Sequence, residues 1–208
     1  MLIAHLLDVQ PGQKILDCCA APGGKTTHLA ALLENQGEIV ALDKYPQRVE
    51  LILQGAARLG CSNISAQAWD LTEPPSFLEE QSFERILLDA PCSGLGVLRR
   101  NPESRWNKSA VNVRELAQLQ QEILFNVAPL VKPGGKLLYS VCSFTLLETD
   151  EIVKDFLAAH PHFVLENLRS VSPPTWAGLF TAQGTLRSYP HLHGGMDAFF
   201  AARFQRCD

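Results

Sequence analysis

Two cysteines of the chain follow apolar runs that are typical of buried strands. Cys92 comes three residues after Asp89, which ends the run 83–89, and Cys142 ends the run 135–142. A cysteine taken alone is more often a small buried hydrophobic residue than a nucleophile. If these runs are neighbouring parallel strands, however, two thiols and a carboxyl group face one crevice at the edge of the sheet. That combination could perform covalent catalysis.

The ring of a cytosine is one substrate that needs such groups. Its carbon 5 is a poor nucleophile, but addition of a thiolate to carbon 6 turns the ring into an enamine that can attack a methyl donor. The proton on carbon 5 must then leave so that the thiolate can be expelled. A thiol of ordinary pKa, about 8.5, needs activation at pH 7. A carboxyl group with a raised pKa at a strand end, such as Asp89, could donate a proton to the ring. These arguments do not choose between the two cysteines.

A turn of small residues follows the first apolar run, 14–18, and reads Cys19-Ala20-Ala21-Pro22-Gly23-Gly24-Lys25. Such residues let a ligand approach the backbone, and a helix that begins near Lys25 would point free N–H groups at it. The ending resembles a nucleotide-binding Walker A loop, but that motif needs glycine where Cys19 stands. The G-x-G-x-x-G motif of nicotinamide cofactors does not occur in the turn either. A plain tight turn is the remaining alternative.

Two acidic residues end the next two strand-like runs. Asp43 lies 20 residues after Gly23, the separation at which a carboxylate bonds the ribose hydroxyls of an adenosine-type cofactor. Asp70 would lie in the same crevice, where it could meet the adenine amino group. Both have plainer alternatives, since Asp43 could cap the helix that begins near Pro46 and Asp70 could cap a turn.

Apolar runs alternate with helical patterns along the chain. The runs cover 14–18, 38–43, 63–69, 83–89 and 135–142, and the helical patterns cover 26–33, 46–59, 113–130 and 148–159. This alternation predicts an α/β fold with a doubly wound, mostly parallel sheet and helices on both faces. Residues 197–204 are expected to form a last strand at an edge.

Length and composition are those of one globular domain. The 208 residues carry a net charge of −4, and 46% of them are hydrophobic. No apolar run approaches the about 20 residues of a membrane span. The six cysteines form no C-x-x-C pair, which argues against a zinc ribbon or a redox motif and favours a reduced, cytoplasmic protein. His191 and His193 have no evident third ligand, so no metal site is expected.

Positive charge is concentrated in the segment 99–114. The overall acidity argues weakly against a nucleic-acid partner. This segment nevertheless offers Arg99, Arg100 and Arg105 for phosphate contacts and Trp106 for stacking on an unpaired base, as an RNA-binding surface would. A solvated loop with a buried tryptophan is the alternative.

Three segments resemble one family when they are taken together. They read DCCAAPGGKTTHLA (17–30), DAPCSGLGVLRRNPESRW (89–106) and LLYSVCSF (137–144). They are similar to the bacterial ribosomal RNA cytosine-5 methyltransferases of the RsmB (Sun, Fmu) group. The resemblance implies a Rossmann-like class I methyltransferase fold with a seven-stranded sheet and an antiparallel edge strand. It also implies S-adenosylmethionine as cofactor and methyl transfer to a cytosine of 16S ribosomal RNA, cytosine 967 in the family, through a covalent cysteine–base adduct.

The resemblance also implies roles for single residues. Cys142 would be the nucleophile, Cys92 would assist product release, and Asp89 would lie where the cofactor meets the target base. The cofactor would lie on the turn 19–25, with Asp43 on the ribose, Asp70 near the adenine and Asp89 beside it. Lys25 could reach the target base or serve only the start of the helix.

The chain departs from the family pattern in places. It has Val141 where relatives usually have threonine, and the segment 147–151 reads LETDE where they have PEENE. Relatives carry an RNA-binding domain before the catalytic core. Residues 1–208 are therefore expected to be a single catalytic domain, monomeric and not in a membrane, that relies on another domain or protein to dock ribosomal RNA. A transfer RNA substrate, a non-catalytic RNA-binding assembly factor and a nicotinamide oxidoreductase remain alternatives.

Overall fold

The computed structural model describes residues 2–107 and 109–207, without the side chains of Ser104, Arg105 and Asn107. Its strands are β1 (Lys14–Cys18), β2 (Glu38–Asp43), β3 (Ile64–Ala68), β4 (Phe83–Asp89), β5 (Val131–Val141), β6 (Phe163–Leu165), β7 (Leu186–Ser188) and β8 (Phe199–Arg206). Its α-helices are α1 (Leu2–Leu6), α2 (Gly24–Leu32), α3 (Pro46–Leu59), α4 (Ala110–Val127), α5 (Asp150–Ala159) and α6 (Leu168–Val171). Short 3-10 helices are η1 (Leu95–Val97), η2 (Pro102–Asn107), η3 (Ala128–Leu130), η4 (Leu146–Glu148) and η5 (Pro174–Leu179).

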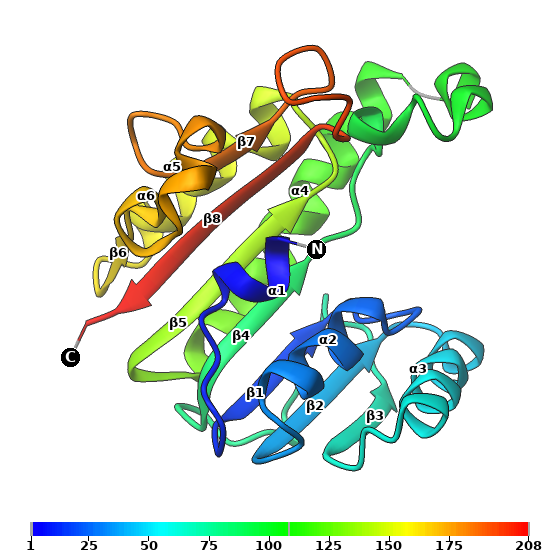
Figure 1. Cartoon of the computed structure of the whole chain (residues 1–208), viewed down its shortest axis with the longest axis vertical. Coiled ribbons are helices and arrows are strands. Elements are labelled where there is room, and N and C mark those ends of the chain that lie inside the picture. The colour runs from blue at the N-terminus through cyan, green and yellow to red at the C-terminus, as the bar shows by residue number, and fades with distance from the viewer. Residues whose placement is uncertain (1, 108, 208) are drawn as a thin grey trace.

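The strands form one sheet in the order β3-β2-β1-β4-β5-β8-β6, with β7 beside β8 (Figure 1). The strands from β1 to β5 pair in parallel, and β8 runs antiparallel to both β5 and β6. The predicted α/β, doubly wound and mostly parallel fold is therefore confirmed.

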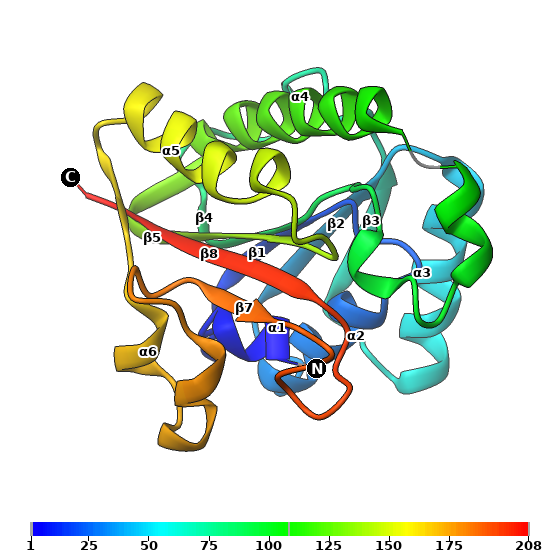
Figure 2. The same cartoon turned by 90° about the horizontal axis from the view of Figure 1, so that it is seen from above.

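Helices cover both faces of this sheet. Figure 2 shows α4 and α5 above it and α1, α2 and α6 below it. Successive residues of β1 pack against the helices on opposite faces of the sheet. Ile15 lies in one apolar cluster with Leu29 of α2, and Leu16 lies in the other with Leu124 of α4. Strands that are apolar on both faces are the pattern expected of a covered parallel sheet. No helix within the described residues is long and apolar enough to cross a membrane.

The sheet differs from the expected one in two details. Among the described residues it has eight strands rather than seven, and the last strand, β8, lies between β5 and β6 rather than at an edge. Strand β5 pairs with one side of β8, while β6 and β7 pair with the other. Both faces of β8 are also covered, since Phe200, Ala202 and Phe204 pack in the apolar cluster of Leu124 and Ala201 packs in that of Leu29, and all four residues are fully buried. Both β6 and β7 are only three residues long, too short to leave a periodic pattern in the sequence.

Candidate active site

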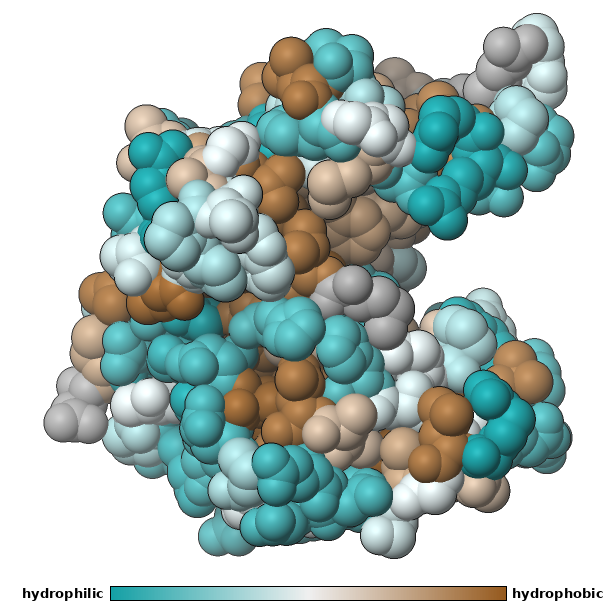
Figure 3. Space-filling model, viewed as in Figure 1, coloured by the Kyte–Doolittle hydropathy of each residue, from teal (hydrophilic) through white to brown (hydrophobic). Residues whose placement is uncertain are grey.

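The carboxyl ends of β1, β4 and β5 open onto a hollow in the molecular surface. The strands β1 and β4 are neighbours, but the chain continues from them toward opposite sides of the sheet, which leaves a crevice at that point. Figure 3 shows the hollow between the lobe that holds η1 and η2 and the lobe that holds α2 and α3. Cys19 directly follows β1, Asp89 ends β4, and Cys142 directly follows β5.

The turn between β1 and α2 requires small residues. Cys19 and Gly23 have positive φ angles of 58° and 97°. A Cβ atom on Gly23 would lie 3.1 Å from Cα of Ile52 in α3, so the close approach to that helix and the positive φ angle together favour glycine at this position. A pocket of about 130 Å³ lies beside the turn, and Asp17, Lys25 and Asp89 contribute to its lining. The turn therefore borders a space for a ligand and is more than a plain connection.

Asp43 holds the turn from the neighbouring strand. Its side chain is only 2% exposed, and its carboxylate accepts hydrogen bonds from the backbone N–H of Ala21 at 3.1 Å and of Tyr45 at 3.3 Å. A guanidinium nitrogen of Arg48 lies 3.4 Å from Oδ1 of Asp43 and forms an ion pair with it. The residue that caps α3 is Tyr45, without a side-chain hydrogen bond, so Asp43 does not have the helix-capping role that the sequence allowed.

A second pocket, of about 190 Å³, continues on the other side of Cys19. Asp43 and Asp70 supply its acidic groups, and Trp69, Leu119 and Ile123 supply apolar walls. Asp70 accepts hydrogen bonds from the N–H and the hydroxyl of Thr72, and it pairs with Lys44 at 2.7 Å. The hydrogen bond from Lys44 lowers the pKa of Asp70. Asp70 thus has the turn role that the sequence allowed and also lines the pocket.

Asp17 is a further candidate site residue, which was not predicted from the sequence. It is fully buried in β1, and its Oδ2 atom accepts a hydrogen bond from the Thr26 hydroxyl at 2.6 Å. Its Oδ1 atom is buried without a hydrogen-bond partner among the described residues, and the residue contributes to the lining of the smaller pocket. Burial raises the pKa of Asp17 to about 7. An acidic residue inside an otherwise apolar strand was the signal that could have identified it.

This raised pKa predicts a pH-dependent contribution to stability. Between about pH 4 and pH 7 the folded protein binds a proton at Asp17 that the unfolded chain releases, so the free energy of unfolding falls as pH rises through this range. Asp17→Asn removes the titration. Chemical denaturation should show the variant gaining stability relative to the unchanged protein as pH rises through this range, by up to about 1.4 kcal/mol for each step of one in pH. The control is Asp155→Asn at an exposed position, for which the difference in unfolding free energy from the unchanged protein should not vary with pH. The same constancy for Asp17→Asn would contradict a raised pKa at Asp17.

Lys25 and Asp89 form an ion pair across the crevice. The Lys25 ammonium lies 2.5 Å from Oδ2 of Asp89, and the Ser140 hydroxyl donates to Oδ1 at 2.8 Å. Lys25 also lies over the ring of Phe199, 5.9 Å from its centre. Both oxygens of Asp89 thus accept hydrogen bonds in this structure, which differs from the proton-donating role that its place at a strand end suggested. The pair borders the smaller pocket and presents a positive and a negative group side by side.

The two cysteines meet at the ends of β4 and β5. The Sγ atoms of Cys92 and Cys142 lie 3.0 Å apart, and both side chains are partly buried. The hydrogen bond from the Cys92 thiol lowers the pKa of Cys142. The same contact, together with burial, raises the pKa of Cys92. Of the two thiols, that of Cys142 is therefore the easier to deprotonate, which is the direction of activation that a nucleophile needs.

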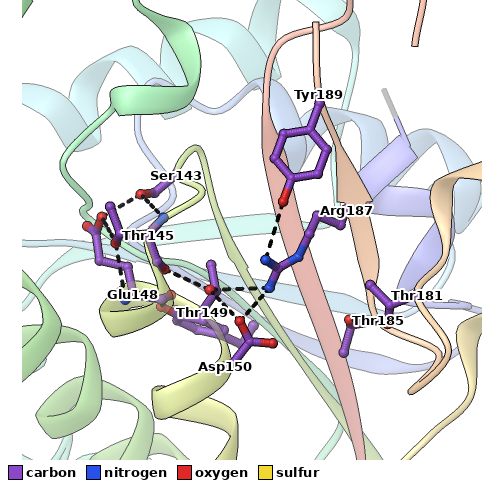
Figure 4. Close-up of polar contacts among 10 residues, drawn as sticks. Ser143, Thr145, Glu148, Thr149, Asp150, Thr181, Thr185, Arg187 and Tyr189 are labelled. Carbon is purple, nitrogen blue, oxygen red and sulfur yellow. Dashed lines mark hydrogen bonds and ion pairs between the residues drawn. The ribbon is translucent and has the colours of Figure 1, made fainter. Parts of the chain in front are cut away.

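Glu148, which the sequence analysis did not select, connects the loops that carry the two cysteines. It is fully buried. Its carboxylate accepts hydrogen bonds from Ser93 beside Cys92, through both N–H and hydroxyl, and from the Ser143 hydroxyl beside Cys142. Burial acts to raise the pKa of Glu148, but these hydrogen bonds outweigh it and lower the pKa. Figure 4 shows its contacts with Ser143 and Thr145.

The basic segment lies at the rim of the hollow. Arg99 donates to the carbonyl of Gly195 at 2.6 Å, and Arg100 pairs with Asp197 at 2.8 Å. Trp106 is 76% exposed, so it is not the buried tryptophan of the alternative interpretation. The side chain of Arg105 lies outside the described part of the structure. These contacts tie the segment to the loop that precedes β8.

Comparison with known sequences identifies related proteins. A model of the family described as 16S rRNA methyltransferase RsmB/F matches residues 4–205. A probable ribosomal RNA small subunit methyltransferase B of Bacillus subtilis is 39% identical over 206 residues, which cover 99% of this chain and 46% of that protein. The human tRNA (cytosine(72)-C(5))-methyltransferase NSUN6 is 47% identical over 178 residues, which cover 79% of this chain and 37% of that protein.

Solved structures agree with these matches. The crystal structure of PH0851 matches with a TM-score of 0.91 and 37% sequence identity, and the match covers 99% of this chain and 45% of the PH0851 chain. The structure of NSun6 from Pyrococcus horikoshii with SFG, an S-adenosylmethionine analogue, matches with a TM-score of 0.83 and 30% sequence identity. This match covers 100% of this chain and 51% of the NSun6 chain. The chain spans about half the length of the curated relatives it matches.

Proposed function

The chain belongs to the 16S rRNA methyltransferase family RsmB/F, and we propose that it transfers a methyl group from S-adenosylmethionine to carbon 5 of a cytosine in ribosomal RNA. The observation that carries the proposal is the pair of thiols, 3.0 Å apart, beside the ion pair of Lys25 and Asp89. Cytosine-5 chemistry needs an activated thiolate and charged groups that hold the ring. Binding of an adenosine cofactor alone would need neither cysteine.

The two pockets around Cys19 fit S-adenosylmethionine. Asp17 lines the smaller pocket and has a buried oxygen without a hydrogen-bond partner among the described residues, which suits the ammonium group of the methionine part. The larger pocket offers Asp43 for the ribose and Asp70 with apolar walls for the adenine. The cofactor, when bound, supplies the methyl group. The backbone of Cys19-Ala20-Ala21-Pro22-Gly23-Gly24-Lys25 would hold it between the two pockets.

The remaining groups act on the base in this proposal. The Cys142 thiolate adds to carbon 6 of the cytosine, which makes carbon 5 able to attack the methyl donor. Asp89 and Lys25 hold the edge of the ring that carries the amino group and the neighbouring nitrogen. A water molecule at the site then accepts the proton from carbon 5, the electron pair of that bond re-forms the double bond between carbons 5 and 6, and the Cys142 sulfur leaves carbon 6 as a thiolate. Cys92, whose sulfur lies beside that of Cys142, assists this release by hydrogen bonding to the departing thiolate.

Asp43 provides a test of the cofactor site. Asp43→Asn should weaken binding of S-adenosylmethionine by roughly 10- to 100-fold, because charge-assisted hydrogen bonds to the ribose are lost. Calorimetric titration should also use an analogue that lacks the ribose hydroxyls. This analogue should bind the unchanged protein weakly, but the variant should discriminate little between it and the parent compound. Equal discrimination by both proteins would mean that Asp43 only supports the turn through Ala21.

Methyl transfer itself is tested with RNA substrates. The protein is mixed with S-adenosylmethionine and unmodified small-subunit ribosomal RNA or transfer RNA, and 5-methylcytosine is located by bisulfite sequencing. The proposal predicts one methylated cytosine in the ribosomal RNA, with cytosine 967 as the expected position. Methylation of transfer RNA alone would favour the alternative that the human relative suggests. Binding of RNA without methylation of either would favour a non-catalytic assembly factor.

Other expectations from the sequence remain predictions. These are the single catalytic domain over residues 1–208, a separate RNA-docking domain or protein, a monomeric state and a cytoplasmic location. The proposed RNA-binding surface of Arg99, Arg100, Arg105 and Trp106 is supported by the position of the segment at the rim of the hollow.

A further inference from the structure

A third pocket lies beside the cysteines and outside the two cofactor pockets. Its volume is about 390 Å³, and three rings, those of Phe144, Tyr189 and His191, contribute to its lining together with Arg99 and Gly96. Phe144 is 44% exposed, and the rings of Tyr189 and His191 lie 5.6 Å apart. Rings that stay accessible beside an arginine are the groups that bind unpaired nucleobases.

The floor of this pocket is joined to the proposed nucleophile. The N–H of Gly96 donates to the carbonyl of Cys142 at 3.0 Å, and the N–H of Ala198 donates to the carbonyl of Gly96 at 2.9 Å. A Cβ atom on Gly96 would lie 2.0 Å from the Ala198 carbonyl oxygen and 2.9 Å from that of Cys142. The three segments are therefore in direct backbone contact at Gly96, so the lining of this pocket is joined to the backbone of Cys142.

One wall of the pocket is held by the same network that holds the cysteines. Arg187 of β7 contacts the hydroxyl of Tyr189 at 3.4 Å and that of Thr149 at 3.3 Å, and it pairs with Asp150 at 2.7 Å (Figure 4). Thr149 directly follows Glu148, whose carboxylate joins the two cysteine loops. The Tyr189 ring is thus fixed relative to the cysteines rather than carried by an independent loop.

We propose that this pocket binds the base of a nucleotide adjacent to the target cytosine. The inference rests on the proposed function, because a cytosine must leave its stack to reach Cys142 and its neighbour then loses a stacking partner. Phe144, two residues after Cys142, supplies a replacement ring face at the correct place, and Arg99 supplies positive charge for the phosphate that joins the two nucleotides. The pocket thereby selects single-stranded or opened RNA.

The test compares Phe144→Ala with Leu146→Ala, a matched control. Leu146 is an exposed apolar residue of the same segment, 60% exposed, and does not line the pocket. Affinity is measured for an unmodified ribosomal RNA fragment that contains the target cytosine. It is also measured for two versions of that fragment, one with an abasic nucleotide before the cytosine and one with an abasic nucleotide after it. Phe144→Ala should weaken binding of the intact RNA by roughly 5- to 100-fold. It should have little effect on binding of the RNA that lacks the base held in the pocket. Leu146→Ala should leave the affinity for both kinds of RNA unchanged.

Photochemical crosslinking gives a second readout that does not depend on turnover. A 5-bromouridine beside the cytosine should crosslink to the peptide that holds Phe144 or to the one that holds Tyr189 and His191. Crosslinks confined to other segments, or equal losses for Phe144→Ala with intact and abasic RNA, would overturn the inference while methyl transfer by the unchanged protein still supports the proposed function. Absence of both methyl transfer and a Cys142–RNA adduct in the unchanged protein would overturn the two together.

Discussion

Replacement of Cys142 by alanine should lower the rate of methyl transfer by at least about 10³-fold. Cys142 is the sulfur whose pKa is lowered by its neighbour Cys92, so its removal takes away the thiolate that must add to carbon 6. S-adenosylmethionine should still bind, because Cys142 lines neither cofactor pocket. The rate is measured by transfer of a labelled methyl group to ribosomal RNA, and cofactor affinity is measured by calorimetry.

Cys207→Ala is the matched control for this variant, because Cys207 is an exposed free cysteine remote in sequence from both cysteine loops. It should retain the full rate. A Cys142→Ala protein that still methylates RNA within about tenfold of the unchanged rate would show that Cys142 is not the nucleophile, and Cys92 would then be the candidate.

Replacement of Glu148 by alanine should affect stability and rate together. The buried carboxylate accepts from the Ser93 N–H, from the hydroxyls of Ser93 and Ser143, and from the side-chain amide of Gln120. Its removal leaves buried donors without their partner, so the free energy of unfolding should fall by about 3 kcal/mol or more. The two cysteine loops also lose the group that joins them, and methyl transfer should fall at temperatures at which the variant is still folded.

Glu148→Gln and Glu151→Ala separate these effects. Glutamine keeps the size of the side chain. Its oxygen can still accept from the Ser93 N–H, and its NH2 group can donate to the hydroxyls of Ser93 and Ser143, which then rotate so that their oxygens accept. It should therefore lose less stability than alanine, as denaturant unfolding would show. Glu151 is exposed in α5, and its replacement should change neither quantity. If Glu148→Ala unfolds like the unchanged protein and methylates RNA at the unchanged rate, Glu148 does not position the cysteines.

The central strands were predictable because they are buried on both faces. The bounds of β1, β2 and β4 agree with the sequence prediction, since continuous apolar runs followed by an acidic residue or a turn mark parallel strands clearly. The elements that the sequence did not predict are short. The helix α1 has five residues and β6 and β7 have three each, and such elements are stabilised by packing on neighbours rather than by a repeating pattern.

The site was predictable where it depends on strand ends. Asp43, Asp89, Cys92 and Cys142 follow from the topology, because the carboxyl ends of parallel strands share one edge. Glu148 could not be identified in this way, because its importance comes from contacts with Ser93, 55 positions away in the sequence. The glutamate that the family carries in the segment 147–151 was the one available signal. The Lys25 ion pair similarly joins residues 64 positions apart, and no local pattern specifies it.

The most direct test of the roles of the two cysteines is covalent trapping. Cys92→Ala protein is mixed with unmodified small-subunit ribosomal RNA and S-adenosylmethionine, and the products are separated on a denaturing gel. The proposed mechanism predicts a slowly migrating protein–RNA band, because Cys142 adds to the base but release is impaired. The band should disappear in the double variant Cys92→Ala, Cys142→Ala. A band that persists without Cys142 would contradict its assignment as the nucleophile.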